Sequence, residues 1–305
     1  MQHRLAFLGC GHMGSVIARG LLKVPKSSTP LCSHLTISVS SDASARRLET
    51  KFAEYKDKVN ILYKKNVQAA NDADVVLLCF PPSQVQNVLS EANMAKAVQD
   101  KLVISILAGV SRKRIQRALN CSIPEEAMTS QGSQGQAQAQ AQAHVVRAMP
   151  SLGAQAGDSA TLVVNEELPL PRHLQELTEN IFKHIGLCHA TPPHLFEPLT
   201  ALAAVSHALM SVAIDAIIDS SVAGGIPRDH ALALASISFR GYSTLLARGD
   251  EPAELKKSLL IAKGFTPHAI VRLEKGAVRS AISDTVLDTL AYMGSMSANK
   301  GANGP

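Results

Sequence analysis

The chain has 305 residues, of which 46% are apolar and 18% charged, so it is not largely disordered and can form one or two domains with a sizeable core. Its formal net charge of +5 suits an anionic small ligand, but the basic residues are not clustered enough for nucleic-acid binding. The five cysteines show no C-x-x-C spacing, and we expect neither a disulfide framework nor a metal site.

Two further observations concern targeting and membranes. The first apolar run begins almost at Met1, which leaves no room for a signal or transit peptide. The most apolar stretch, 199–226, carries His207, Asp215 and Asp219 in its middle, and such residues argue against a membrane span. We therefore expect a cytoplasmic enzyme that binds neither nucleic acid nor membrane.

The N-terminal segment predicts a nucleotide site. Residues 5–8 form an apolar run, Gly9, Gly11 and Gly14 match G-x-G-x-x-G, and apolar residues at helical spacing follow. A buried strand, a glycine turn and a helix in this order are typical of dinucleotide-binding folds, in which the helix N-terminus faces the phosphates. The alternative is a glycine-rich turn that joins a strand to a helix without binding a ligand.

The end of the second expected strand indicates which cofactor binds. Strand 35–40 leads into Ser40 and Ser41 instead of the acidic residue that NAD-preferring folds use to bind the ribose hydroxyls. Arg46 and Arg47 follow on the next helix, where a guanidinium can hold a 2′-phosphate. We predict NADPH, with NADH as the alternative cofactor. The opposing interpretation is that the two arginines only solvate a helix face.

Strands and helices alternate as far as residue 192, where we expect the NADP-binding domain (1–192) to end. The polar, low-complexity segment 121–143 predicts a disordered surface insertion, with a helical Gln/Ala arm as the alternative. The alternation predicts an α/β Rossmann domain with a mostly parallel, doubly wound sheet. Its further strands are expected at 60–63, 74–80, 102–107, 145–149, 160–164 and 187–189.

No strand pattern follows residues 191–193, which read Thr-Pro-Pro. We expect an all-α domain over 193–298 and a flexible tail over 299–305. This helical domain has more apolar surface than one copy can bury, which predicts an obligate dimer. Its helices are expected at 196–223, 228–248, 252–261, 268–275 and 278–296.

Six segments spread over nearly the whole chain carry a family resemblance: FLGCGHMGSVIARGLL, DVVLLCFPP, VISILAGVS, VVRAMPSLGAQAGDSATLV, GGIPRDHALALA and DEPAELKKSLL. Through them the chain resembles the pyrroline-5-carboxylate reductase family. The resemblance implies a Rossmann domain and a helical domain that interlocks with a second subunit. It also implies an active site at the dimer interface and hydride transfer from NADPH to a cyclic imine carbon. It leaves open whether the dimers assemble further.

The resemblance also implies roles for individual residues. Thr266 is the expected catalytic residue, whose hydroxyl reaches the substrate nitrogen, while the backbone N–H groups of Gly264 and Phe265 bind the substrate carboxylate. Fourteen residues are expected to bind the cofactor: Gly9, Gly11, His12, Met13 and Gly14 at the diphosphate, Ser40, Ser41 and Asn66 near the adenosine ribose, Phe80, Pro81, Ala108 and Gly109 around the nicotinamide ribose, and Met149 and Pro150 under the nicotinamide.

The substrate half departs from the family pattern, while the cofactor half is largely kept. Pro81 stands where the family typically has Lys, and Ser151 where it has Asn. Residues 203–209 replace a segment like S-G-S-G-P-A-Y, and 261–266 replace one like S-P-G-G-T-T. These changes lie in the two loops that shape the imino-acid pocket.

Several polar residues in the helical domain allow two interpretations. Lys263 either pairs with the substrate carboxylate or points to solvent. His207 either binds a polar group of the substrate or is a hydrogen-bonded core residue. Asp215 and Asp219 lie one helical turn apart, which we interpret as a solvated or interface face instead of an acid–base pair.

Three functions are consistent with the sequence. The first is NADPH-dependent reduction of 1-pyrroline-5-carboxylate to L-proline. The second is reduction of another cyclic imine or imino acid by the same fold, which the altered pocket loops favour. The third is a non-catalytic NADP-binding dimer. Assays with five- and six-membered imines separate the first two, and cofactor binding without imine-dependent oxidation would favour the third.

Overall fold

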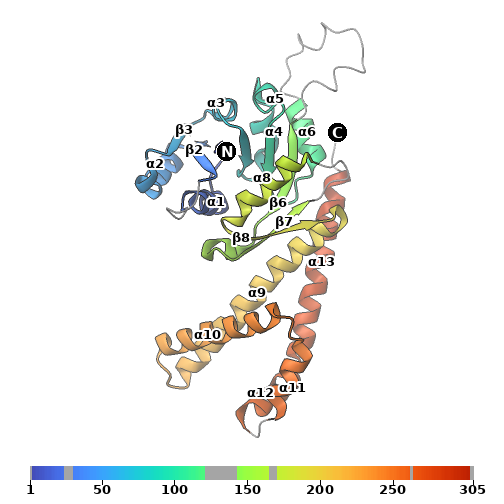
Figure 1. Ribbon diagram of the computed structural model, residues 1–305. Helices are drawn as coiled ribbons and strands as arrows, with labels where there is room; N and C mark the ends of the chain where they lie inside the picture. Colours follow the sequence, from blue (N-terminus) through green and yellow to red (C-terminus); the bar gives the residue numbers. More distant parts are fainter. Residues whose placement is uncertain (1, 24–29, 121–142, 165–169, 262–263, 303–305) are drawn as a thin grey trace. The chain divides into compact units, whose positions relative to one another are not determined.

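The computed structural model describes residues 2–23, 30–120, 143–164, 170–261 and 264–302. The chain divides into two compact units, Met1–Thr200 and Ala201–Pro305, and the division falls within helix α9 (Pro193–Ala223). The first unit is built mainly from strands and helices in alternation, whereas the second is all-α (Figure 1). Except for Ala143, the segment expected to be a disordered insertion lies outside the described residues.

Eight strands form one sheet in the first unit, in the order β3-β2-β1-β4-β5-β6-β7-β8. The described strand pairs are parallel except for β6 and β7, which are antiparallel. This confirms the predicted mostly parallel sheet. The strands are β1 (His3–Leu8), β2 (Cys32–Val39), β3 (Val59–Tyr63), β4 (Val75–Leu78), β5 (Leu102–Ser105), β6 (His144–Met149), β7 (Ser159–Val164) and β8 (Gly186–Thr191).

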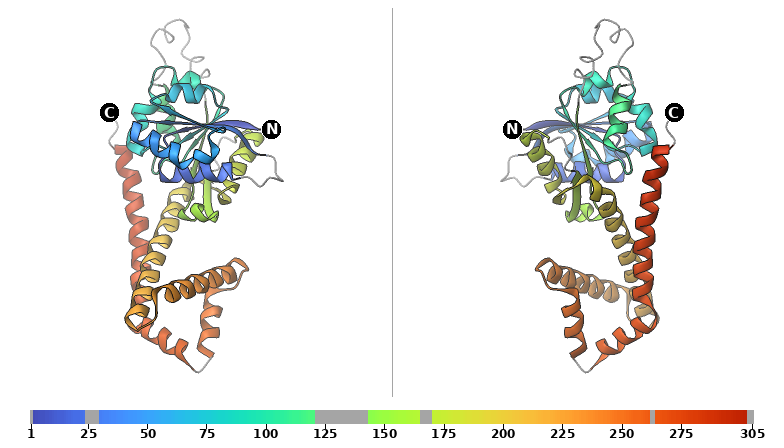
Figure 2. Two further views of the ribbon diagram at one scale, coloured as in Figure 1. Left: turned by 90° about the vertical axis from the view of Figure 1, so that its left-hand side faces the viewer. Right: turned by 90° about the vertical axis from the view of Figure 1, so that its right-hand side faces the viewer.

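Helices cover both faces of this sheet because successive residues of a strand point to opposite sides (Figure 2). Phe7 of β1 is buried on one face with Ile17 of α1 and Phe182 of α8. Its neighbour Leu8 is buried on the other face with Ile115 of α6. The helices of this unit are α1 (His12–Leu22), α2 (Asp42–Lys51), α3 (Asn66–Asn71), α4 (Val85–Leu89), α5 (Met94–Ala97), α6 (Arg112–Asn120) and α8 (Arg172–Lys183), with 3₁₀ turns η1 (Ala53–Tyr55), η2 (Pro82–Gln84) and η4 (Leu152–Ala156).

The first turns of α9 pack on the sheet unit. Phe196 is buried with Leu162 and Val164 of β7. The guanidinium of Arg147, a buried residue of β6, lies 4.5 Å from the centroid of the Phe196 ring and forms an ion pair with Glu197. A buried charge needs such partners, since a lone charge in the core is costly.

The second unit consists of helices joined by short connections. They are the rest of α9, α10 (Arg228–Ala247), α11 (Pro252–Ile261), α12 (Phe265–Lys275) and α13 (Val278–Ala302). Helix α12 begins at Phe265 and not at residue 268 as expected from Pro267. A proline is tolerated in the first turn of a helix because its missing N–H would have no partner within the helix. Helix α13 continues to Ala302, past residue 299, where we expected the flexible tail to begin.

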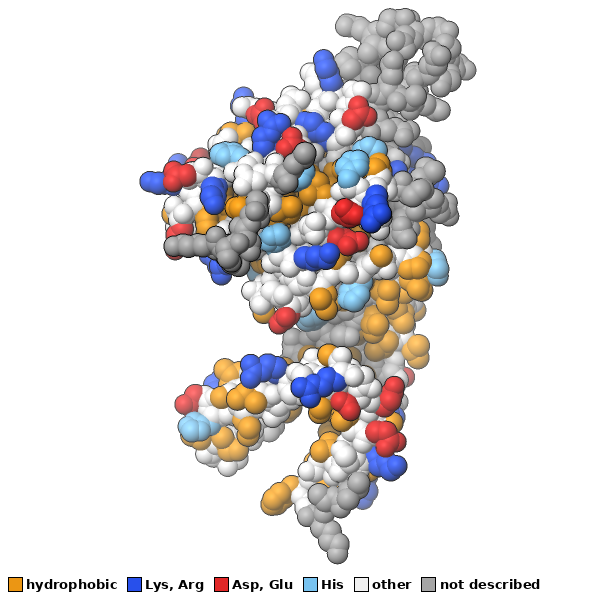
Figure 3. Space-filling model, in the orientation of Figure 1, with side chains coloured by type: hydrophobic (Ala, Val, Ile, Leu, Met, Phe, Trp, Pro, Cys, Tyr) orange, Lys and Arg blue, Asp and Glu red, His pale blue; other side chains and the backbone are white. Residues whose placement is uncertain are grey.

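Large apolar side chains of the second unit are exposed, as the orange atoms of Figure 3 show along its helices. Examples are Val212 on α9, Leu234 on α10 and Leu287 on α13, which are 72%, 69% and 64% exposed. Among the described residues one helix, α9, is long and apolar enough to cross a membrane by length and composition alone. Continuous exposed apolar surface of this kind also marks a protein–protein interface.

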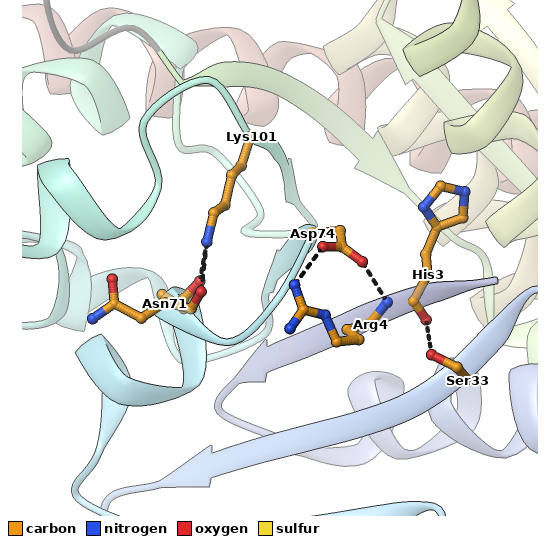
Figure 4. A network of polar contacts seen from close by, with 7 residues as sticks. His3, Arg4, Ser33, Asn71, Asp74 and Lys101 are labelled. Carbon is orange, nitrogen blue, oxygen red and sulfur yellow. Dashed lines mark hydrogen bonds and ion pairs between the residues drawn. The ribbon is translucent and has the colours of Figure 1, made fainter. Parts of the chain in front are cut away.

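A polar network holds the amino ends of the parallel strands (Figure 4). Asp74, which precedes β4, accepts hydrogen bonds of 2.9 Å from the backbone N–H and from the guanidinium of Arg4 on β1. The Lys101 ammonium, just before β5, donates 2.8 Å hydrogen bonds to the carbonyls of Ala70 and Asn71 at the end of α3. These bonds satisfy carbonyls that a helix C-terminus leaves without partners.

We expect Asp74→Asn to lower the stability of the protein near neutral pH. The hydrogen bond from Arg4 lowers the pKa of the Asp74 carboxyl. A lowered folded-state pKa stabilises the protein above the unfolded pKa of about 4, and that contribution is lost as the pH falls through the folded pKa. Urea unfolding should therefore show a difference between wild type and variant near neutral pH that shrinks in acid.

The control for this experiment is Asp72→Asn, because the Asp72 carboxyl acts on Arg4 only through its charge. A loss of stability of the same size in both variants would contradict a specific role for the Arg4–Asp74 pair.

Candidate active site

A cavity of about 480 Å³ lies at the carboxyl ends of β1, β2, β4 and β5. The order of the strands reverses between β1 and β4, since β2 and β3 lie on one side of β1 and β5 on the other. Ligands of open α/β sheets bind at such a switch point. Its lining comprises Gly9, Cys10, Gly11, His12, Met13, Gly14, Val39, Ser40, Ser44, Arg47, Cys79, Phe80, Pro81, Pro82, Ile106, Leu107 and Ala108.

The glycine turn between β1 and α1 has the shape of a diphosphate cradle. Gly9 has φ +76°, and a Cβ added there would lie 2.9 Å from backbone atoms of Phe80. A Cβ on Gly14 would lie 3.1 Å from the Cβ of Cys79, so the glycine lets α1 pack close to β4. A Cβ on Gly11 would meet no protein atom within 4 Å, which leaves that side of the backbone open to a ligand.

The start of α1 is also suited to an anion. Gly11 is the residue that precedes the helix, and it offers no side-chain oxygen to the N–H groups of the first turn. Those N–H groups and the positive end of the helix dipole therefore face the cavity, where phosphate oxygens can accept from them. The residues present thus fit the diphosphate of a dinucleotide.

The two neighbouring arginines of α2 are placed differently. Arg47 lines the cavity with Ser40 and Ser44, and its Nη2 lies 3.5 Å from the carbonyl oxygen of Cys10. Arg46 forms an ion pair of 2.9 Å with Asp42 on the exposed face of α2. No acidic side chain occurs among the described residues that line the cavity. The side of the cavity formed by Ser40, Ser44 and Arg47 therefore favours a ribose that carries a 2′-phosphate over one that does not.

Ser41 and Asn66 have structural partners. The Ser41 hydroxyl caps α2, since it accepts a hydrogen bond of 3.2 Å from the backbone N–H of Ser44. The Asn66 side chain accepts from the Ser38 hydroxyl at 2.8 Å and donates to the Glu91 carboxylate. Neither residue is among the described residues that line the cavity.

Only some of the residues expected around the nicotinamide line the cavity. Phe80, Pro81 and Ala108 line the cavity, while Gly109, Met149 and Pro150 are not among its described lining residues. Met149 is the last residue of β6, two strands away from β4 in the sheet, and Pro150 follows it.

The residues expected on the substrate side belong to the second unit. Gly264 precedes α12, and Thr266 and Phe265 lie exposed in its first turn, where Phe265 is 96% exposed. Lys263 lies outside the described residues. The His207 ring is half-buried on α9, and its Nδ1 lies 2.7 Å from the carbonyl oxygen of Ala203 on the same helix.

Sequence reasoning did not single out Cys10, Ser44 or Cys79 as part of the cavity. Their position could have been inferred from neighbouring residues in the chain, because Cys10 lies inside the glycine motif and Cys79 directly follows β4. Burial raises the pKa of both thiols, so they are neutral at physiological pH and are poor nucleophiles. Among the described residues, no group of three or more His, Cys, Asp or Glu side chains is placed to hold a metal ion.

Comparison with known families agrees with both units. Residues 193–296 match the family described as pyrroline-5-carboxylate reductase dimerisation, and residues 4–109 match the family described as NADP oxidoreductase, coenzyme F420-dependent. The first match supports a homodimer.

Several proteins that are similar over nearly the full length are named pyrroline-5-carboxylate reductase. The pyrroline-5-carboxylate reductase of Lophium arboricola is 30% identical, with 98% of this chain and 95% of that protein covered. The pyrroline-5-carboxylate reductase of Neurospora crassa is also 30% identical, with 92% of this chain and 89% of that protein covered. The crystal structure of Plasmodium falciparum pyrroline carboxylate reductase with NADP bound has the same fold, with a TM-score of 0.74 at 19% identity over 97% and 98% of the two chains. This chain therefore belongs to the pyrroline-5-carboxylate reductase family.

Proposed function

We propose that this protein reduces 1-pyrroline-5-carboxylate to L-proline with NADPH, as a homodimer in the cytoplasm. The observation that carries the proposal is the cavity at the switch point of the sheet. Its lining includes the glycine turn, which has the shape of a diphosphate cradle, and the basic side chain of Arg47. It occurs in a chain that is similar over its full length to proteins named for this reaction. We propose that the dimerisation domain starts at residue 193, where α9 begins and where the match to the dimerisation family starts.

The proposed cofactor residues follow the geometry of the cavity. The backbone of Gly9, Gly11 and the first turn of α1 holds the diphosphate. Ser40, Ser44 and Arg47 hold the 2′-phosphate, with Ser41 fixing the start of α2. Phe80, Pro81, Ala108 and Gly109 are proposed around the nicotinamide ribose, with Met149 and Pro150 under the ring. When bound, NADPH supplies the hydride.

The proposed substrate residues lie at the start of α12. Gly264 precedes α12 and has no side chain that could accept hydrogen bonds from the backbone N–H groups of the first turn. Those N–H groups are therefore suited to bind the substrate carboxylate. The Thr266 hydroxyl is proposed to accept from the iminium N–H and to fix its orientation. A protonated imine is already electrophilic, so the protein has only to position its carbon and exclude water. We propose that a partner subunit supplies α12 at the dimer interface.

His207 and Lys263 have weaker roles in this proposal. The His207 Nδ1 contact with Ala203 favours the interpretation of a hydrogen-bonded helix residue, and its other ring nitrogen is left for a substrate or partner contact. Lys263 is kept as a proposed partner for the substrate carboxylate.

The second candidate function is reduction of a different cyclic imine. It is favoured by Ala204, Ser206 and His207 on α9, which stand where a family segment like S-G-S-G-P-A-Y has Gly, Gly and Pro, and by the changed sequence before Thr266. Larger side chains at these positions change the shape of a pocket without changing hydride transfer. A non-catalytic NADP-binding dimer is the third.

Steady-state NADPH oxidation with five- and six-membered cyclic imino acids tests the proposal. We expect kcat/KM for 1-pyrroline-5-carboxylate to exceed that for the six-membered analogue by roughly tenfold or more. The two substrates differ by one methylene, and a fitted pocket can discriminate against one extra methylene by about this factor. Equal or reversed preference would favour the second candidate. Binding of NADPH without oxidation in the presence of any imine would favour the third.

A further inference from the structure

One ion pair of the sheet unit is largely shielded from water. The guanidinium of Arg147 on β6 pairs with the carboxylate of Glu197 in the first turns of α9, and the two side chains are 11% and 30% exposed. By contrast, the paired side chains of Arg172 and Glu176 on α8 are 92% and 58% exposed. Because water and salt screen it less, the Arg147–Glu197 pair fixes its two elements more firmly than a surface pair does.

The ring of Phe196 joins this ion pair to Met149. Arg147 and Met149 are two residues apart on β6, so their side chains leave the same face of the sheet. The Arg147 guanidinium lies 4.5 Å from the centroid of the Phe196 ring, and Met149 packs against the small apolar cluster that contains Phe196. Met149 is only partly buried, so part of its side chain stays exposed. We call Arg147, Phe196 and Glu197 the α9 clasp.

The chain just after Met149 is held by a second set of contacts. The backbone N–H of Ser151 donates a hydrogen bond of 3.1 Å to the hydroxyl of Ser159, and the Ser151 hydroxyl accepts one of 3.0 Å from the backbone N–H of Ala160. Ser159 and Ala160 are the first residues of β7. Segment 149–150 therefore lies between two anchors, the α9 clasp and these bonds to β7.

Segment 149–150 also lies at the edge of the sheet that carries the cofactor cavity. Strand β6 runs parallel to β5, so the carboxyl ends of the two strands lie side by side. Residues 106–108, which follow β5, line the cavity. The proposed function assigns Met149 and Pro150 to the underside of the nicotinamide. The support under this ring must be fixed, because hydride transfer needs the reacting carbons about 3–3.5 Å apart.

We propose that Arg147 and Glu197 are positioning residues for hydride transfer: their ion pair, acting through Phe196, fixes Met149 under the nicotinamide ring. The inference rests on the proposed function, because it takes the nicotinamide of NADPH as the group above Met149. Neither charged residue is among the described residues that line the cavity, so the pair acts on the orientation of the ring and not on the attachment of the dinucleotide. Loss of the pair slows hydride transfer and leaves NADPH affinity nearly unchanged.

The test removes both charges at once, in the double variant Arg147→Met, Glu197→Gln. The rate of hydride transfer is measured in a single turnover, by mixing the NADPH complex with saturating 1-pyrroline-5-carboxylate, because product release can limit kcat. We expect this rate to fall about 10- to 100-fold, as a small misplacement of the reacting groups can cost this much. The NADPH Kd, measured by calorimetry, should change by less than about threefold, since the pair contributes to the transition state and not to binding.

Three further measurements separate positioning from stability. Exchange of both members of a buried ion pair for uncharged side chains often leaves stability nearly unchanged, so the thermal midpoint of the double variant should stay near the wild-type value. The matched control, Arg172→Met with Glu176→Gln, removes the exposed pair of α8 and should keep the wild-type rate. Glu197→Asp keeps the charge and should retain more of the rate than Glu197→Gln.

A wild-type rate of hydride transfer in the double variant would overturn the inference. A rate that falls only in proportion to the folded fraction, or an NADPH Kd that rises as much as the rate falls, would do the same, since the pair would then hold the fold or the whole cavity. If the double variant does not fold, equal rates in Glu197→Asp and Glu197→Gln would overturn it. A wild-type protein that binds NADPH but oxidises it with no cyclic imine would instead overturn the proposed function.

Discussion

Replacing Gly11 by alanine is expected to weaken NADPH binding by about 100-fold while the protein stays folded. The reason is that a Cβ on Gly11 meets no protein atom within 4 Å, so the change costs little in the free protein. The same methyl group occupies the space through which the backbone approaches the diphosphate. Loss of one charge-assisted hydrogen bond, worth about 1.5–3 kcal/mol, corresponds to roughly 10- to 150-fold in Kd.

Gly9→Ala is the matched variant, with the opposite balance. Its Cβ would lie 2.9 Å from backbone atoms of Phe80, and alanine is strained at φ +76°. We therefore expect Gly9→Ala to lower the thermal midpoint clearly, while Gly11→Ala leaves it near the wild-type value. Thermal unfolding without ligand and NADPH titration at low temperature separate the two effects. Wild-type NADPH affinity in Gly11→Ala would show that the diphosphate does not lie against this turn.

Arg47→Ala is expected to raise the KM for NADPH about 10- to 100-fold and to leave the KM for NADH nearly unchanged. Arg47 lines the cavity beside Ser40 and Ser44, and its guanidinium is proposed to bind the 2′-phosphate that NADH lacks. The loss corresponds to roughly 1.5–3 kcal/mol for hydrogen bonds to a charged group. The ratio of kcat/KM for the two cofactors is the measurement that checks this result.

The neighbouring arginine provides the control. Arg46 has the same charge, but it pairs with Asp42 on the exposed face of α2, so Arg46→Ala should change the cofactor ratio by less than about threefold. If both variants lost NADPH preference equally, the effect would come from the general charge of the helix. If neither did, the 2′-phosphate would not lie on the side of the cavity formed by Ser40, Ser44 and Arg47.

The cofactor cavity could be predicted from the sequence because its geometry follows from local rules. An apolar strand, a glycine turn and a helix define the cradle, and the carboxyl ends of parallel strands lie at one edge of the sheet. Residues that directly follow such strands, such as Ser40 and Phe80, therefore come together although they are far apart in the chain. The same reasoning found the alternation of strands and helices that makes the first unit α/β.

Other assignments depended on contacts that no local pattern contains. Asn66 is expected near a ribose, and the structure adds that its side chain bonds Ser38 of β2 and Glu91 of the connection after α4, two contacts that no local pattern predicts. Pro267 was expected to delay a helix that in fact begins at Phe265, since a proline two residues into a helix costs no hydrogen bond. Such outcomes depend on which partner is nearest in space.

The sequence by itself determined the class of fold and the position of the glycine turn, because glycines, apolar periodicity and strand ends act within short segments of chain, and its similarity to other sequences determined the family. Only the tertiary structure decided that Arg47 and not Arg46 lines the cavity, and that Arg147 is buried between Phe196 and Glu197. The physical reason is that a side chain's direction and its charged partners are set by packing between elements distant in sequence, and a pattern of residue types does not contain that information.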